Sequence, residues 1–237
     1  MKARDFRARA REALRGKWGI AIIACLIASI FGAAGSSGFS INFDFSESDF
    51  DYMDPSFAQP LNQTMDESVA PILIGMGIFM IVYSIIVLIV GSVVSIGYSE
   101  FNVDLIDGFD LKIGTLFSHF KQTKSAIGAS LLIFLRVFVG MIFFIVPGII
   151  ASYKYSMTYY IMAENPGITA RDAMYRSKEL MRYNKWRLFC LDLSFIGWNL
   201  LNLLTFGLAS LWVLPYQNAA RAAFYREIRS ELECYSW

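Results

Sequence analysis

Four long apolar stretches dominate the pattern of hydrophobic and polar positions along the chain. Three contain no Asp, Glu, Lys or Arg, and the fourth, 125–163, is interrupted only by Arg136 and Lys154. A helix of about 20 apolar residues is long enough to cross the hydrocarbon core of a bilayer. The pattern therefore predicts an all-α, polytopic integral membrane protein in which 1–237 form a single transmembrane domain. The uninterrupted stretches are 18–43, 68–99 and 193–220.

Two apolar zones are too long for one crossing, and turn-forming residues divide them. Pro147 and Gly148 divide the third zone, and Thr205-Phe206-Gly207 divide the last zone, 188–220. This predicts about six transmembrane helices in three hairpins, although a tilted or re-entrant fourth segment stays open because that segment is short. The first four spans are expected at about 18–39, within 71–96, at 126–146 and at 148–163; the last two lie on either side of the Thr205–Gly207 break.

Charges between the apolar zones set the expected topology. The segments 1–17 and 164–187 are basic, as is the C-terminal tail, whereas 40–69 holds seven acids and no Lys or Arg. Cytoplasmic loops of membrane proteins carry an excess of Lys and Arg. We therefore expect a bacterial plasma membrane protein with both termini and 164–187 in the cytoplasm and the acidic loop 40–69 outside. Over the chain, 56% of residues are hydrophobic and 17% are charged, against about 45–50% and about 25% in soluble domains.

Amphipathic helices are expected at the membrane surface in addition to the spans. Residues 1–17 have the pattern of a basic helix lying on anionic lipids of the inner leaflet, although the same charges also serve as a topology signal. A short interfacial helix is expected around 113–120. Thr169 and Asp172 resemble a capping box that begins a cytosolic helix over 170–182. The expected lipid-surface contacts of the first helix are Arg4, Arg7, Arg9 and Arg11.

Small residues recur at helical spacing in the first two spans. Such stripes let helix backbones approach closely, so we expect them to be packing faces. They comprise Ala24, Ala28, Gly32 and Ser36 in the first span and Gly91, Ser95 and Ser99 near the end of the second.

Three ionisable residues fall inside the expected spans, where charges are costly and often functional. Asp192 is the only acid within these spans, and Arg136 lies near the middle of the third. One interpretation is a structural Arg136–Asp192 ion pair that joins spans three and five. The other is that both line a polar cavity or a lipid-headgroup site. Lys154 is expected to extend toward the outer headgroups.

Signatures of catalysis, cofactors and metals are missing from the sequence. The chain has no GxSxG, HExxH, Walker A or Rossmann pattern. Its single histidine, His119, is expected to be an ordinary interfacial residue, and the three cysteines are scattered. We therefore expect neither an enzyme nor a bound cofactor, and no nucleic-acid partner.

The acidic loop over 40–69 suggests two further possibilities. An EF-hand needs Gly at its sixth position and Glu at its twelfth, but counting from Asp49 these positions hold Asp54 and Pro60. Calcium binding is therefore disfavoured. Interleaved aromatic residues are more typical of a membrane surface, and recognition of a cationic peptide by this loop is a third functional hypothesis.

Several local patterns are distinctive in combination: Leu14-Arg15-Gly16-Lys17-Trp18, Pro147-Gly148-Ile149-Ile150, 159–166, Ser177-Lys178-Glu179-Leu180-Met181, 195–201, Leu214-Pro215-Tyr216 and Phe224-Tyr225. Together they resemble an uncharacterised integral membrane protein family of Gram-positive bacteria, a domain of unknown function. That family is distantly similar to the membrane domain of some glycerophosphodiester phosphodiesterases. The resemblance implies six spans and no activity, since no phosphodiesterase catalytic domain is present. One departure is Arg182-Tyr183-Asn184-Lys185, where relatives commonly carry a glycine after the methionine.

The leading functional hypothesis is a non-enzymatic membrane module with a scaffold or regulatory role. Its expected partners are membrane lipids, anionic on the cytoplasmic side, or another membrane protein. The alternative is a transporter or permease subunit whose polar path includes Arg136 and Asp192. A water-filled cavity that reaches Arg136 would favour transport.

Overall fold

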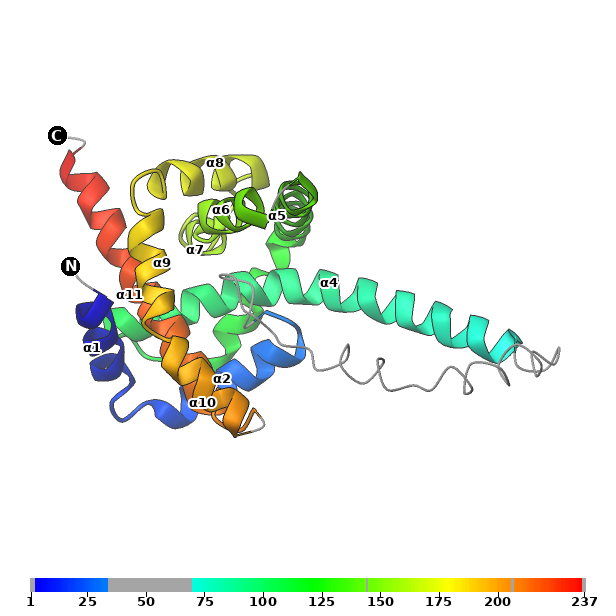
Figure 1. Cartoon of the computed structure of the whole chain (residues 1–237), viewed down its shortest axis with the longest axis horizontal. Coiled ribbons are helices and arrows are strands. Elements are labelled where there is room, and N and C mark those ends of the chain that lie inside the picture. The colour runs from blue at the N-terminus through cyan, green and yellow to red at the C-terminus, as the bar shows by residue number, and fades with distance from the viewer. Residues whose placement is uncertain (1–2, 34–69, 144, 206, 236–237) are drawn as a thin grey trace. The chain divides into compact units, whose positions relative to one another are not determined.

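The computed structural model describes residues 3–33, 70–143, 145–205 and 207–235, and these residues form helices joined by turns, with no strand among them (Figure 1). This confirms the all-α prediction for the described part of the chain. The chain divides into two compact units, one of residues 1–39 and 88–237 and the other of residues 40–87. The acidic loop expected over 40–69 lies outside the described residues.

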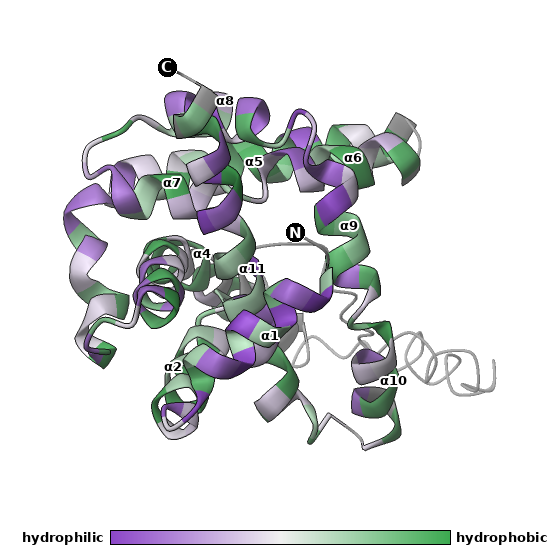
Figure 2. Ribbon diagram, turned by 90° about the vertical axis from the view of Figure 1, so that its left-hand side faces the viewer, coloured by the Kyte–Doolittle hydropathy of each residue, from purple (hydrophilic) through white to green (hydrophobic). Residues whose placement is uncertain are grey.

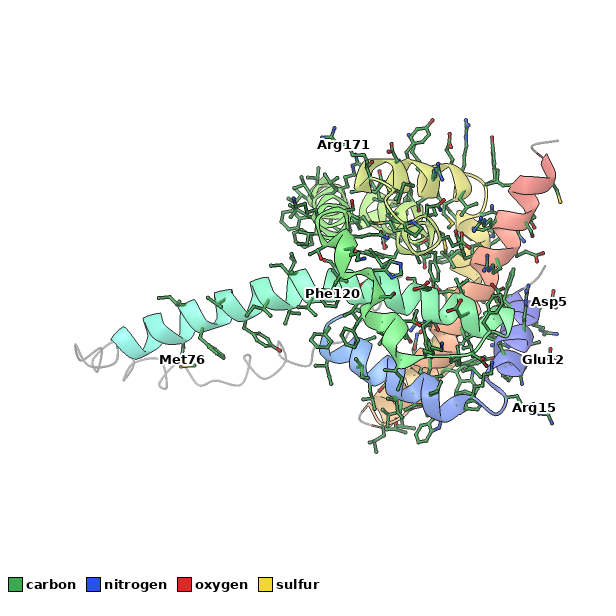
Figure 3. All side chains as sticks on the ribbon, turned by 180° about the vertical axis from the view of Figure 1, so that it is seen from behind. Asp5, Glu12, Arg15, Met76, Phe120 and Arg171 are labelled. Carbon is green, nitrogen blue, oxygen red and sulfur yellow. The ribbon has the colours of Figure 1, made fainter. Side chains whose placement is uncertain are left out.

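The described part of the smaller unit is the beginning of helix α4 (Ala70–Asp107), up to residue 87. It carries no charge, and its large apolar side chains are exposed, including Met76, Phe79 and Tyr83. The side chain of Met76 extends away from the helix in Figure 3. Exposed apolar residues at successive helical positions suit an apolar surrounding.

Residues 88–107 of α4 form the central helix of the larger unit, where nearly every side chain from Gly91 to Val103 is buried. Small residues make this possible. A Cβ at Gly91 would collide with the Phe31 carbonyl oxygen, and one at Gly97 would lie 2.5 Å from the Leu116 carbonyl oxygen. The predicted close-packing face around Gly91 is therefore confirmed, and so is that of Ala24 and Ala28, which are fully buried in α2 (Trp18–Ile30).

The first helix, α1 (Ala3–Leu14), is amphipathic as predicted but packs differently from the expectation. Its apolar face, formed by Phe6, Ala10 and Leu14, is buried, and the Phe6 ring lies 5.3 Å from that of Phe224 in α11 (Ser210–Tyr235). Protein therefore covers the face that was expected to lie on lipid. The polar face of α1, with Asp5 and Glu12, points away from the neighbouring helices, as does Arg15 just after α1 (Figure 3).

Eight helical elements follow α4 in the larger unit (Figure 1). The 3₁₀ helix η1 confirms the short helix predicted near 113–120, and α8 confirms the one predicted from 170. They are η1 (Ile113–Gln122), α5 (Thr123–Phe143), α6 (Ile145–Tyr155), α7 (Thr158–Glu164), α8 (Ala170–Leu180), α9 (Lys185–Leu193), α10 (Ile196–Leu204) and α11.

Helices α5 and α6 form a tight hairpin. A Cβ at Gly140 would lie 3.0 Å from the Cα of Gly148, so the two backbones approach closely near the hairpin tip. The break occurs a few residues before Pro147, which lies in the first turn of α6, where its missing N–H leaves no helical hydrogen bond unmade. The second predicted break is confirmed at Gly207, which follows α10 with φ of +87°.

The structure supports fewer membrane spans than the charge pattern predicts. Two stretches of the described helices, Ile86–Asp107 and Ile113–Ile142, are long and apolar enough to cross a membrane, and a third if α1 and α2, bent by 105°, count as one span. The predicted fourth and fifth spans are interrupted between α6 and α7 and between α9 and α10. The four resulting helices, α6, α7, α9 and α10, have 11, 7, 9 and 9 residues, and each is too short to cross a membrane alone.

The two long apolar stretches also differ in their surroundings. The most apolar part of Ile86–Asp107 is 67% buried within the protein, whereas that of Ile113–Ile142 is only 11% buried. The first is therefore a core helix, and the second presents apolar side chains outward. Figure 2 shows hydrophobic residues along α10 as well, in contrast to the hydrophilic surface of α8.

Ion pairs join α11 to the ends of other helices. Arg226 contacts Asp107 at the end of α4 and Glu164 at the end of α7, the latter at 2.6 Å. Arg187 of α9 pairs with Glu231 at 2.7 Å. The basic C-terminal segment thus fixes the positions of three other helices.

Candidate functional site

The predicted Arg136–Asp192 pair is not formed. The Asp192 carboxylate instead accepts hydrogen bonds from Arg221 Nε at 3.1 Å and Nη2 at 2.9 Å. The pair is enclosed, since 14% of the Asp192 side chain and 3% of the Arg221 side chain are exposed. The prediction failed because it considered only acids and bases inside the expected spans and assigned Arg221 to the cytoplasmic tail. Asp192 thus joins α9 to α11.

Arg136 and Lys154 both lie close to one aromatic ring, that of Tyr155. The Arg136 guanidinium carbon is 5.3 Å from the centroid of the Tyr155 ring, and Lys154 Nζ is 5.6 Å from the same centroid. Arg136 also donates to Met174 Sδ at 3.7 Å. The two charges are therefore at most about 11 Å apart, and both face α8.

Helix α8 is oriented by its cap and by its contact with α6. The Thr169 hydroxyl accepts a hydrogen bond from the Asp172 backbone N–H at 3.2 Å, which confirms the predicted cap. Ser177 Oγ donates to the Lys154 carbonyl oxygen at 3.0 Å. A Cβ at Gly128 would lie 3.4 Å from Ala170 Cβ, so α8 also lies close to α5. These contacts bury one face of α8 and leave its charged face outward.

Two adjoining cavities open where α5, α6, α8 and the start of α9 meet. The first, of about 350 Å³, is lined by Lys154, Tyr175, Lys178, Glu179, Arg182 and Lys185. The second, of about 270 Å³, is lined by Arg136, Tyr155, Arg171, Met174, Tyr175 and Lys178. Arg171 lies at the outer edge of α8 (Figure 3). We call the two cavities together the basic hollow; its cationic residues are Arg136, Lys154, Arg171, Lys178, Arg182 and Lys185.

The basic hollow has a strong excess of positive charge. Glu179 is the one acid among the residues that line it, against six cations. The Glu179 carboxylate is also engaged, because its hydrogen bond with the Tyr175 hydroxyl raises the pKa of Tyr175. The excess of cations over acids makes the hollow suited to an anion.

Exposed apolar side chains of the α5–α6 hairpin continue from the basic hollow toward the hairpin tip. Every residue between Arg136 and Lys154 is uncharged. At 1.5 Å per residue, Arg136 lies about 10 Å and Lys154 about 14 Å along the helix axis from the hairpin tip. The exposed members of this segment include Phe138, Ile142, Val146 and Ile150.

The four arginines predicted to contact lipid along α1 have different surroundings. Arg7 Nη1 donates to the Ser194 carbonyl oxygen at 2.9 Å, and its guanidinium lies 6.0 Å from the centroid of the Phe195 ring. Arg7 therefore joins α1 to the α9–α10 connection. The remaining three, Arg4, Arg9 and Arg11, are exposed on the polar face of α1.

His119 is buried, in contrast to the interfacial position predicted for it. Its ring lies where the helical dihedral angles of η1 are interrupted, with Nδ1 2.8 Å from Ser118 Oγ and 3.4 Å from a Glu100 carboxylate oxygen. Within the described ranges, no three His, Cys, Asp or Glu side chains are grouped to hold a metal ion.

Sequence reasoning did not identify the basic hollow as one site. It identified Arg136 and Lys154 as intramembrane charges and the segment 164–187 as basic, but treated them as separate features. The available signal was the spacing of basic residues in and just after α8: Arg171, Lys178 and Arg182 recur at intervals of seven and four, so a continuous helix would place them on one side.

Comparison with known proteins gives a family but no function. No curated protein and no solved structure matches the chain. The family model described as "Protein of unknown function (DUF975)" matches residues 47–232, most of the chain. This confirms the expected resemblance to an uncharacterised domain family, while the similarity to the membrane domain of glycerophosphodiester phosphodiesterases stays a prediction. The chain belongs to DUF975, a family of proteins of unknown function.

Proposed function

We propose that this protein is a non-catalytic membrane module that binds anionic phospholipids, with the headgroup phosphate in the basic hollow and an acyl chain along the α5–α6 hairpin. The observation that carries the proposal is the convergence of six cationic side chains on two adjoining cavities beside an uncharged, exposed hairpin. Because the proposed activity is lipid binding without catalysis, the protein would act as a scaffold or a regulator.

Electrostatics favours an anion in the hollow. Arg136 and Lys154 lie at most about 11 Å apart, so they repel by at least about 0.4 kcal/mol at the dielectric constant of water and about 1.5 kcal/mol at that of a protein surface. Glu179 offsets one of the six charges lining the hollow. A bound phosphate would turn this repulsion into attraction, and guanidinium groups suit phosphate oxygens because they form paired hydrogen bonds.

The hairpin fixes the depth at which the lipid would bind. An amphipathic segment that lies at a membrane surface buries its apolar part by about 5–10 Å. The uncharged tip extends about 10–14 Å beyond the basic hollow, by helix rise. With the hollow at the level of the phosphates, the tip therefore enters the acyl region. At this depth the α5–α6 hairpin would enter the membrane and return on the same side, because a full crossing needs about 30 Å beyond the phosphate level.

The charge pattern supports the inner leaflet of a bacterial plasma membrane as the location. Basic residues are concentrated in 1–17, 164–187 and the C-terminal segment, and the acids in 40–69. By the positive-inside tendency, the hollow and both termini would lie on the cytoplasmic side. Arg4, Arg9 and Arg11 would add a weaker, less specific attraction to the same surface.

The transport alternative needs Arg136 and Asp192 on one polar path. The two residues have separate partners, Tyr155 with Met174 and Arg221 respectively. The cavity beside Arg136 is lined by α8 rather than by Asp192. The geometry therefore favours headgroup binding over a path through the protein.

The test compares two substitutions on α8 in the full chain. Lys178 lines both cavities, whereas Arg176 is exposed on the same helix and lines neither. A basic side chain near an anionic surface contributes about 1 kcal/mol, so Lys178→Gln should weaken binding to phosphatidylglycerol vesicles about fivefold. Arg176→Gln should weaken it less than twofold. Equal effects of the two variants, or no preference for phosphatidylglycerol over phosphatidylcholine, would contradict the proposal.

A further inference from the structure

The basic hollow consists of two cavities that share one wall. Lys178 and Tyr175 line both, and each cavity has further cations of its own. The first adds Lys154, Arg182 and Lys185, and the second adds Arg136 and Arg171. The site therefore offers two neighbouring places for an anionic group rather than one.

Each cavity also takes one of its cations from a different helix of the hairpin. Arg136 comes from α5 and lines the second cavity, and Lys154 comes from α6 and lines the first. The centroid of the Tyr155 ring lies 5.3 Å from the Arg136 guanidinium carbon and 5.6 Å from Lys154 Nζ. Beyond each cation, its own helix presents apolar side chains toward the tip, such as Phe138 on α5 and Ile150 on α6.

The number of positive charges around the hollow disfavours a ligand with a single phosphate. The six cations less Glu179 leave five positive charges around the hollow. One phosphodiester offsets one of them and leaves the other cavity without a counterion. Basic pockets of this kind on the inner side of membrane proteins suit headgroups that carry more than one phosphate.

We propose, resting on the function above, that the hollow binds one diphosphatidyl lipid, with one phosphodiester in each cavity and the bridge between them against Lys178 and Tyr175. The acyl chains of the two phosphatidyl groups then follow the apolar sides of α5 and α6. Two linked phosphates bind more tightly than two separate ones because the second contact becomes intramolecular.

The experiment measures binding of the full chain to vesicles of phosphatidylcholine that contain either diphosphatidylglycerol or phosphatidylglycerol, at equal total phosphate of the anionic lipid. We expect at least tenfold tighter binding to the diphosphatidyl lipid. Either Arg136→Gln or Lys154→Gln alone should reduce that advantage to less than threefold, because each removes one of the two phosphate contacts. Arg136→Lys and Lys154→Arg keep the charge and should retain most of it, and Arg176→Gln is the matched control.

Each outcome distinguishes the proposals. Equal binding of the two anionic lipids, with both preferred over phosphatidylcholine alone, would overturn the two-phosphate inference and leave the proposed function standing. No preference for either anionic lipid would overturn both. Inorganic pyrophosphate provides a soluble probe: if it bound as tightly as the diphosphatidyl lipid and with the same sensitivity to Arg136→Gln, the ligand would be a soluble diphosphate and the lipid assignment would be wrong.

Discussion

The buried ion pair between Asp192 and Arg221 gives a prediction whose magnitude follows from the structure. Arg221→Met keeps the length and apolar stem of the side chain but removes both hydrogen bonds to Asp192 Oδ1. Because 14% of the Asp192 side chain is exposed, water compensates only in part. Breaking a buried pair by removing one partner typically costs about 3–5 kcal/mol, since a buried charge is left without its counterion.

Two further features limit the size of this effect. The Tyr153 hydroxyl also hydrogen-bonds to Asp192, so the carboxylate keeps one donor when Arg221 is removed. Protonation sets the upper limit, because protonating an ordinary aspartic acid at pH 7 costs about 4 kcal/mol. We therefore expect Arg221→Met to lower the free energy of unfolding by about 3–4 kcal/mol at pH 7. The double variant Asp192→Asn with Arg221→Met should recover at least half of this loss, because no buried charge remains.

The assay is denaturant unfolding of the detergent-solubilised chain, followed by helical circular dichroism, with Arg176→Met as the control because Arg176 is exposed. The control should change stability by less than about 0.5 kcal/mol, as is usual for surface substitutions. The reasoning fails if Arg221→Met costs no more than the control. It also fails if the double variant is less stable than Arg221→Met alone, because the cost would then come from packing rather than from the unpaired charge.

Three further predictions concern the packing and the ion pairs. Gly97→Val should prevent native packing of η1 on α4, since even a Cβ would lie 2.5 Å from the Leu116 carbonyl oxygen, and loss of the cooperative unfolding transition is the measurement. Arg187 lowers the pKa of Glu231 by hydrogen bonding, so their pair should contribute stability above about pH 4.3, the unfolded value, and lose it as the pH falls through the lower folded pKa. Because the pair is partly exposed, its contribution should be below about 1 kcal/mol, and the stability difference between wild type and Arg187→Gln should vanish in acid. Arg7→Gln should lower the free energy of unfolding by about 1–2 kcal/mol through its lost hydrogen bond to Ser194, whereas Arg9→Gln should leave it unchanged; equal effects would contradict the separation of these two arginines.

Local features of the fold could be predicted from the sequence because their physics is local. Thr169 with Asp172 begins α8 as expected, since the capping hydrogen bond joins residues three apart. The small residues around Gly91 packed closely as expected, because a missing side chain has the same effect whichever neighbour fills the space. Helix type, helix starts and packing faces therefore follow from short segments of chain.

The partners of distant residues could not be predicted in the same way. Asp192 pairs with Arg221 rather than Arg136, and Arg7 bonds to Ser194 rather than facing lipid. In both cases the turns that join the helices determine how the helices pack, and this packing decides which side chains meet. The interruptions between α6 and α7 and between α9 and α10 lack a strong Pro or Gly signal, so uninterrupted spans were predicted where the chain bends.

The position of Arg136 and Lys154 bears on what this protein would bind. A charge in an apolar helix ordinarily finds an opposite charge nearby, because an unpaired one is costly in a low-dielectric surrounding. Here both cations lie against Tyr155 and a helix that adds further cations, while Asp192 is engaged by Arg221. Among the described residues neither cation forms an ion pair, and under the proposed function the phosphates of a lipid surface would supply the negative charge. On this argument, Arg136→Gln and Lys154→Gln should leave the free energy of unfolding in detergent nearly unchanged, or raise it, and yet weaken lipid binding. A loss of several kcal/mol in detergent would instead show that the protein itself supplies their counterions.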